Sequence, residues 1–222
     1  MTQIKICGMT NQEDALFAAS SGVDALGFIF YEKTPRFVTP EKAKGIIAAL
    51  PGEVARIGVF VNHSYDEIER IRTFCNLDMI QLHGDESPEF CRRFPSSMVV
   101  RSFALRTEDD LRLLDDYPGT PILADSYAPG LRGGTGRIVD WNLARRVMKT
   151  HPLILSGGLS PDNISEALAA VSPDAVDINS GVETAPGKKD PEKIRAIVDL
   201  IRRSEGTAVA NGERIFRLSA RL

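Results

Sequence analysis

The stretch LILSGGLSPDNISEALAAVSPDAVDINSGVE (residues 153–183) contains two short apolar runs separated by a helix-like segment. The runs, LILS (153–156) and AVDIN (175–179), each end in a glycine-bearing turn, and the residues Ser160-Pro161-Asp162 open the segment between them. This order predicts a β-strand, a helix and a second, parallel strand. Because glycine has no Cβ, backbone N–H groups in two neighbouring strand-to-helix turns can together cup a phosphate. The stretch therefore predicts a βαβ unit that binds a phosphorylated ligand.

The same alternation of apolar runs and amphipathic segments continues along the whole chain. Eight strands are predicted, at 4–7, 25–30, 56–61, 79–83, 99–103, 122–125, 153–156 and 175–179. Helices are predicted between them, at 11–21, 40–50, 65–74, 88–94, 108–117, 142–150, 161–170 and 191–203. Eight such units in one chain of this length favour a single-domain (β/α)₈ TIM barrel over residues 1–205, although the count alone leaves an open doubly wound sheet as an alternative.

Two segments do not belong to the repeat. The longest irregular piece, SYAPGLRGGTGRIVD (126–140), has a length and glycine content that suit either a mobile lid or a plain flexible loop. Residues 206–222 form a C-terminal tail outside the barrel repeat, which we expect either to dock on the outside or to be disordered.

Bulk properties limit the classes of function. The 222 residues carry a net charge of −3, which gives no electrostatic reason to expect a nucleic acid or membrane partner. No apolar run is long enough to span a bilayer, and the N-terminus does not read as a signal peptide. Three widely spaced cysteines form neither a disulfide framework nor a zinc pattern, so we expect a reducing, cytoplasmic setting.

Polar residues gather where the predicted strands end, which is where barrels of this kind carry their chemistry. They are a thiol, a carboxyl, an imidazole, a guanidinium and a second carboxylate, at Cys7, Asp125, His83, Arg36 and Asp177. Each alone has a structural interpretation: a buried thiol, a capping carboxylate, a satisfied imidazole or a surface charge. Together, beside a phosphate cup, they indicate a catalytic site. Histidine and carboxylate spacings that suit a metal are missing from the sequence, as is the GxGxxG of a dinucleotide site.

Strand periodicity refines this picture, because side chains two residues apart share a face. Lys5 therefore lies on the same face as Cys7, where it can either favour the thiolate or pair with Asp177. The residues between the polar ones, Ile6 and Ile178 among them, are bulky and apolar, as a face under the helices requires.

The motifs resemble those of the phosphoribosylanthranilate isomerase family over residues 4 to about 203. The resemblance rests on KICGMT (5–10), ALGFIF (25–30), TPR (34–36), GVFV (58–61), QLHGDE (81–86), LADS (123–126), GGTG (133–136), LSGGLSPDNI (155–164), DINSGVE (177–183) and PGKKD (186–190). It implies a barrel of the ribulose-phosphate-binding type and an Amadori rearrangement, the isomerisation of an aminoaldose to an aminoketose in tryptophan biosynthesis. It further implies a small-molecule substrate, no cofactor, and a monomer or homodimer. Asn179, where the family commonly has serine, is a departure beside the phosphate turn.

The resemblance also assigns roles to residues. It makes Cys7 the general base and Asp125 the general acid, and it places Arg36 against the anthranilate carboxylate. His83 and Asp177 would line the substrate site. The phosphate cup would consist of Gly157, Gly158, Ser180 and Gly181.

Three other interpretations compete with this one. A related isomerase of histidine biosynthesis would place aspartates at both acid and base positions, which Cys7 argues against. An indole-glycerol-phosphate synthase would need an acid–lysine site that the sequence does not display. A barrel that only binds phosphate ligands would keep SGGL and SGVE but lose Cys7 or Asp125, and both are present.

Overall fold

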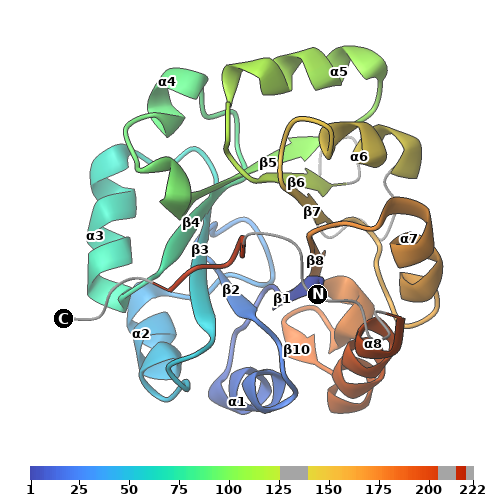
Figure 1. The fold of residues 1–222 in the computed structure, drawn as a ribbon. Coiled ribbons are helices and arrows are strands. Elements are labelled where there is room, and N and C mark those ends of the chain that lie inside the picture. Colours follow the sequence, from blue (N-terminus) through green and yellow to red (C-terminus); the bar gives the residue numbers. More distant parts are fainter. Residues whose placement is uncertain (126–139, 205–213, 219–222) are drawn as a thin grey trace.

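The computed structural model of the chain describes residues 1–125, 140–204 and 214–218. Eight parallel strands pair in sequence order and close into a barrel, with β8 hydrogen-bonded to β1, and helices surround it on the outside (Figure 1). The strands are β1 (Gln3–Ile6), β2 (Ala25–Ile29), β3 (Ala55–Phe60), β4 (Met79–Leu82), β5 (Val99–Ala104), β6 (Ile122–Asp125), β7 (Leu153–Leu155) and β8 (Ala175–Ile178). The predicted (β/α)₈ barrel is confirmed, and the open sheet is wrong.

Each predicted helix is present, although several are shorter than expected. They are α1 (Gln12–Ser20), α2 (Pro40–Ala48), α3 (Tyr65–Cys75), α4 (Pro88–Cys91), α5 (Glu108–Arg112), α6 (Trp141–Val147), α7 (Ile164–Val171) and α8 (Pro191–Ser204). The N-cap residues Thr39, Ser64 and Ser87 accept a hydrogen bond from the backbone of the first turn, which satisfies donors that the helix itself cannot. Short 3₁₀ segments follow α4 and α5, at Ser96–Met98 and Leu113–Asp116.

The larger hydrophobic core lies between the strands and the helices. Ile6, Leu82 and Ile178 are fully buried there against helical residues such as Ile68 and Ile197. This is the face that the strand periodicity predicted for them. The polar residues of alternate positions consequently point into the barrel, where Lys5, Gln81 and Asp177 are buried.

The connections at the predicted phosphate turns differ from expectation. The helix expected from Pro161 begins at Ile164 instead, because 161–163 form a turn and Asn163 occupies the N-cap position. The second turn does not lead directly into a helix either. A 3₁₀ turn (Ser180–Val182) is followed by an unpredicted two-stranded hairpin, β9 (Glu183–Ala185) and β10 (Lys188–Lys189), before α8 begins.

The described part of the tail, residues 214–218, lies across the N-terminal end of the barrel, where the red segment crosses the strands in Figure 1. Ile215 and Phe216 are almost completely buried. They share a cluster with residues near the starts of the strands: Ala25, Ala55, Ile57, Met79, Val100, Leu123, Ile154 and Ala175. The side-chain oxygen of Gln3 accepts from both backbone N–H groups, at 2.6 Å and 3.0 Å. This segment therefore packs into the bottom of the barrel.

Candidate active site

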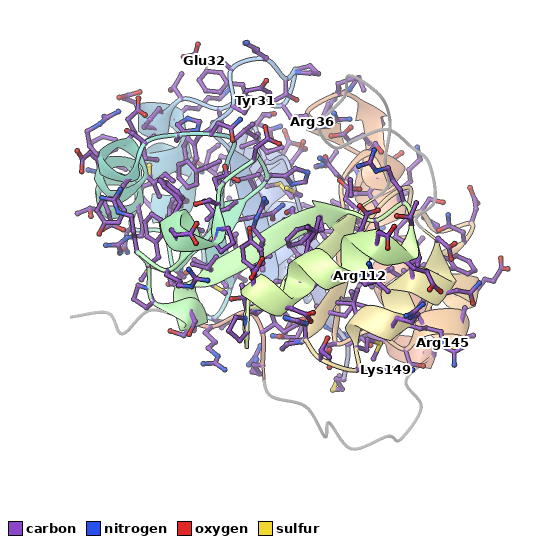
Figure 2. All side chains as sticks on the ribbon, turned by 90° about the horizontal axis from the view of Figure 1, so that it is seen from above. Tyr31, Glu32, Arg36, Arg112, Arg145 and Lys149 are labelled. Carbon is purple, nitrogen blue, oxygen red and sulfur yellow. The ribbon has the colours of Figure 1, made fainter. Side chains whose placement is uncertain are left out.

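A cavity opens at the C-terminal end of the barrel, opposite the tail. It brings together all five polar residues that the sequence singled out: Cys7, Arg36, His83, Asp125 and Asp177. Cys7 and His83 directly follow β1 and β4, Arg36 lies in the loop after β2, and Asp125 and Asp177 lie on β6 and β8. Figure 2 shows Tyr31, Glu32 and Arg36 gathered at this end, whereas Lys149 lies toward the other. Tyr31, Thr34, Ser156 and Asn179 also line the cavity.

Cys7 lies beside a buried ion pair. Lys5 Nζ is 2.8 Å from Asp177 Oδ1, and the two residues are cross-strand partners on β1 and β8. Burial raises the pKa of the Cys7 thiol above its ordinary value of 9.0, and the positive charge of Lys5 counteracts this only in part. Of the two roles expected for Lys5, the structure shows the pairing with Asp177, so Lys5 is not free to favour the thiolate fully.

Gly27 on β2 makes room for this thiol. A Cβ at Gly27 would stand 2.6 Å from Cys7 Sγ, closer than side-chain atoms tolerate, and 3.1 Å from Lys5 Nζ. Sequence reasoning missed this position, because ALGFIF shows a glycine in a strand but not what approaches it. Such a glycine is a general sign of close approach by another group.

Asp125 lies beside the imidazole of His83, which in turn contacts further polar side chains. His83 Nε2 lies 3.4 Å from Asp125 Oδ2, and Gln81 Nε2 lies 2.9 Å from His83 Nδ1 and 3.1 Å from Ser102 Oγ. The amide nitrogen of Gln81 can only donate, so Nδ1 accepts in this contact, and Nε2 faces the carboxylate. Gln81 and Ser102 were not predicted as site residues.

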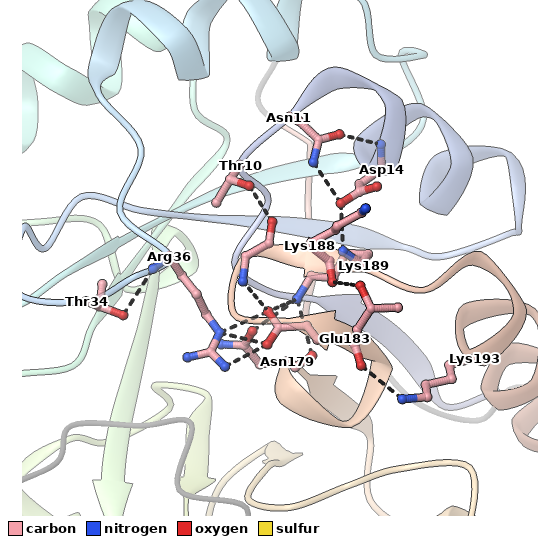
Figure 3. Close-up of polar contacts among 12 residues, drawn as sticks. Thr10, Asn11, Asp14, Thr34, Arg36, Asn179, Glu183, Lys188, Lys189 and Lys193 are labelled. Atoms are coloured by element: carbon pink, nitrogen blue, oxygen red, sulfur yellow. Dashed lines mark hydrogen bonds and ion pairs between the residues drawn. The ribbon is translucent and has the colours of Figure 1, made fainter.

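Arg36 forms a hydrogen-bonded ion pair with Glu183, a contact that sequence reasoning also missed. Its Nε and Nη2 donate to Glu183 Oε1 and Oε2 at 2.9 Å and 2.7 Å, and Lys189 Nζ donates to Oε1 at 3.0 Å. Figure 3 shows the side chains of Arg36 and Lys189 converging on Glu183. Both partners stood in the quoted motifs SGVE and PGKKD, but nothing in the local sequence pointed to Arg36.

The glycine turns after β7 and β8 touch each other. Gly157 and Gly158 have positive φ angles of 86° and 66°, a conformation that disfavours other residues. A Cβ at Gly181 would lie 1.9 Å from the carbonyl oxygen of Leu159, so only glycine lets the second turn approach the first. The two turns are therefore adjacent, as predicted, although the helix after the first turn begins later than expected, at Ile164.

Some expectations concern other parts of the chain or other kinds of site. Residues 126–139 of the segment that was expected to be either a lid or a flexible loop, including the GGTG motif, lie outside the described residues. All three cysteines are buried and free of disulfides. In the residues that the structure describes, we find no cluster of three or more metal-ligating side chains, and no helix long and apolar enough to cross a membrane.

Comparison with known proteins identifies the family. Residues 4–200 match the family model of N-(5'-phosphoribosyl)anthranilate isomerase. The chain is 52% identical over 214 residues to the N-(5'-phosphoribosyl)anthranilate isomerase of Syntrophus aciditrophicus, covering 96% of this chain and 93% of that protein. The chain belongs to the N-(5'-phosphoribosyl)anthranilate isomerase family. The family predicted from the motifs is confirmed.

Solved structures of N-(5'-phosphoribosyl)anthranilate isomerases share the fold. The crystal structure of the Thermotoga maritima enzyme is 40% identical with a TM-score of 0.85, covering 91% of this chain and 100% of that one. A second isomerase structure is a complex with reduced 1-(o-carboxyphenylamino)-1-deoxyribulose 5-phosphate. It is 39% identical with a TM-score of 0.82, and the match again covers 91% of this chain and 100% of that one.

Proposed function

We propose that the chain converts N-(5-phosphoribosyl)anthranilate to 1-(2-carboxyphenylamino)-1-deoxyribulose 5-phosphate by an Amadori rearrangement in tryptophan biosynthesis. Cys7 is the general base and Asp125 the general acid. The observation that carries the assignment is the convergence of this thiol and this carboxyl on one cavity with Arg36, in a chain of the isomerase family. Ring opening and the tautomerisation that follows both proceed through proton transfers, which a general acid and a general base can supply.

The chemistry starts with ring opening. Protonated Asp125 gives its proton to the ring oxygen as the C1′–O bond breaks, which leaves a protonated Schiff base at C1′. The iminium acidifies the C2′ proton, and the Cys7 thiolate removes it to give an enolamine. Protonation at C1′ and loss of the enol proton then yield the ketone, so that no atom is gained or lost overall. An acid and a base of this kind contribute about 10²–10⁴-fold each.

The substrate has an anionic group at each end, and both are bound at the mouth in this proposal. The carboxylate of the anthranilate ring meets Arg36, and the phosphate meets the turns at Gly157, Gly158, Ser180 and Gly181. Support for the phosphate site comes from the positive φ angles of the first turn and the close approach of the second. His83 and Asp177 line the space between the ends. Holding both ends orients C2′ toward the base.

The test is a fluorescence assay that follows the disappearance of phosphoribosylanthranilate. The wild-type chain should consume it. Cys7→Ser and Asp125→Asn should each lower kcat by at least about a hundredfold with a much smaller change in KM. Turnover near the wild-type rate in Asp125→Asn would remove the general-acid role, and a pure KM effect in Cys7→Ser would make the thiol a binding group. The expected monomer or homodimer and the cytoplasmic setting stay predictions.

A further inference from the structure

The hairpin β9–β10, which interrupts the path from β8 to α8, supplies two buried charges to the mouth of the barrel. Glu183 opens the first strand and Lys189 ends the second. We propose that both are positioning residues that aim Arg36 at the carboxylate of the substrate, and that they thereby set the selectivity for ligands that carry this carboxylate. The proposal rests on the proposed function, because that function places the anthranilate carboxylate at Arg36.

The contact between Glu183 and Arg36 fixes the plane of the guanidinium group. Two of its nitrogens, Nε and Nη2, are engaged by the two carboxylate oxygens in a bidentate arrangement, which restrains both position and orientation. Nη1 has no hydrogen-bond partner among the residues that the structure describes, and Arg36 lines the cavity. A guanidinium group has a second edge for a second carboxylate. Glu183 thus holds one edge and leaves the other for the ligand.

Lys189 decides the charge of this cluster. Glu183 alone would neutralise Arg36, and a neutral pair attracts an anionic ligand poorly. Lys189 Nζ lies 3.0 Å from Glu183 Oε1, so two cations share one anion and one positive charge is left over. Burial lowers the pKa of Lys189, and the charge of Glu183 offsets this in part. Burial also acts to raise the pKa of Glu183, but its bonds to Arg36 and Lys189 outweigh this, so the pKa is lowered.

The hairpin is tied to the rest of the site, so Glu183 has a defined place. The backbone N–H of Gly187 donates to Glu183 Oε1 at 3.1 Å, and the N–H of Lys189 donates to Asp14 Oδ2 at 2.7 Å (Figure 3). Lys189 Nζ also donates to Asn179 Oδ1, at 3.1 Å, and Asn179 lines the cavity. These bonds connect Glu183 and Lys189, and through them Arg36, to α1 and to the residue that directly follows β8.

Gly8 lets the side chains of Arg36 and Asn179 approach the backbone that follows β1. It follows Cys7 directly, has a φ of +77°, and a Cβ there would lie 2.8 Å from Asn179 Oδ1 and 3.1 Å from Arg36 Cδ. The arginine and the asparagine are therefore packed onto the backbone next to the base. A shift of Arg36 would move the ligand relative to Cys7, which is why its position matters for the reaction.

The experiment compares two ligands in the full chain. One is reduced 1-(2-carboxyphenylamino)-1-deoxyribulose 5-phosphate, and the other is the same compound with a phenylamino group that lacks the carboxylate. Calorimetric titration of the wild-type chain gives the ratio of the two dissociation constants. In Glu183→Gln the carboxylate ligand should bind at least about tenfold more weakly, the size expected for hydrogen bonds to a charged group. The dissociation constant of the ligand without a carboxylate should change by less than about twofold, so the difference in affinity between the two ligands should shrink.

Lys189→Met is the second variant, and it does not depend on the folding of the first. It keeps the hydrogen bonds between Arg36 and Glu183 but removes the surplus positive charge. The preference for the ligand with the carboxylate should therefore again fall. Glu192→Gln is the matched control, because Glu192 is an exposed partner of Arg195 on α8 and should leave the ratio unchanged. Circular dichroism of each variant reports whether the barrel is intact.

Three results would overturn the proposal: an equal loss for both ligands, an unchanged ratio in both variants, or tighter binding of the carboxylate ligand in Glu183→Gln. The last would mean that Glu183 competes with the ligand for Arg36. A failure of the proposed function is distinguishable from these, because the wild-type chain would then not consume phosphoribosylanthranilate.

Discussion

Lys5 and Asp177 form an ion pair of 2.8 Å inside the barrel, with Lys5 only 1% exposed and Asp177 only 6%. Burial lowers the pKa of Lys5, but the negative charges of Asp177 and Cys7 outweigh it, so the pKa is raised. Asp177 in turn raises the pKa of the Cys7 thiol, in addition to the larger effect of burial. The pair thus keeps a lysine charged in the barrel and at the same time limits how far that lysine favours the thiolate.

We expect Asp177→Asn to act on stability and on the base in opposite directions. Lys5 would be left buried without its anion, which costs about 3–5 kcal/mol when a buried pair is broken. The thiolate would lose a repelling charge, so the alkaline limb of kcat/KM should move to lower pH. Urea unfolding and a pH–rate profile measure the two effects. Glu89→Gln, in an exposed pair with Arg92, should leave both unchanged. A limb that stays in place would separate Asp177 from the titration of Cys7.

The raised pKa of Cys7 predicts a thiol that becomes more reactive in alkali. The reactive form of a thiol is the thiolate, and burial places its pKa above 9.0. The fraction of thiolate in the free enzyme therefore increases tenfold for each pH unit below that pKa, and the rate at which iodoacetamide alkylates Cys7, followed by mass spectrometry, should rise with pH through neutrality and past 9.0. Cys7→Ser should abolish this alkylation, whereas Cys91→Ala, a change at a buried thiol outside the cavity, should keep it. A plateau that begins below pH 8 in the wild type would contradict the raised pKa of Cys7.

Gly27→Ala should damage catalysis far more than folding. The new methyl group would stand 2.6 Å from Cys7 Sγ, so the thiol must move away from its place beside Lys5. We expect kcat to fall by at least about tenfold, since a displacement of 1 Å at such a site can cost a hundredfold. Gly45→Ala is the matched control. Gly45 lies on the exposed side of α2, where an added Cβ meets nothing within 4 Å, and alanine there should stabilise the chain by about 1 kcal/mol. Equal kcat values in the two variants would contradict the prediction.

The sequence predicted what depends on local pattern. The alternation that sets Ile6 against the helices and Cys7 into the cavity follows from the period of a strand. The positions of the five candidate site residues followed from a fold rule, since the carboxyl ends of all strands of a closed barrel meet at one mouth.

What the sequence did not predict depends on contacts between distant residues. Arg36 and Glu183 are 147 positions apart, and neither the arginine after a strand nor the glutamate after a turn indicates its partner. The contact between Gly27 and Cys7 needs the pairing of two strands before it exists. The hairpin β9–β10 was missed because its strands are only three and two residues long, too short for a period to appear.

The tail was predicted to lie outside the barrel repeat. Its described residues, 214–218, pack against the closed barrel, a contact that the sequence did not indicate. The weak alternation in ERIFRL does not reveal a binding place, because the place is made by the closed barrel. Alanines begin β2, β3 and β8, and the small side chains of Ala25, Ala55 and Ala175 surround the buried Phe216 and Ile215. We propose that residues 214–218 complete the lower core of the barrel domain.

Phe216→Ala should therefore destabilise the chain without changing its chemistry. Phe216 is 3% exposed, and truncation of a buried phenylalanine costs about 3–5 kcal/mol. The catalytic cavity lies at the opposite end of the barrel, so kcat and KM at 25 °C should stay near the wild-type values while the midpoint of urea unfolding falls. Leu218→Ala is the matched control, because Leu218 is 47% exposed and its truncation should shift stability by less than about 0.5 kcal/mol. Equal midpoints for the two variants would mean that the tail adds nothing to the barrel, and the domain would then end with α8.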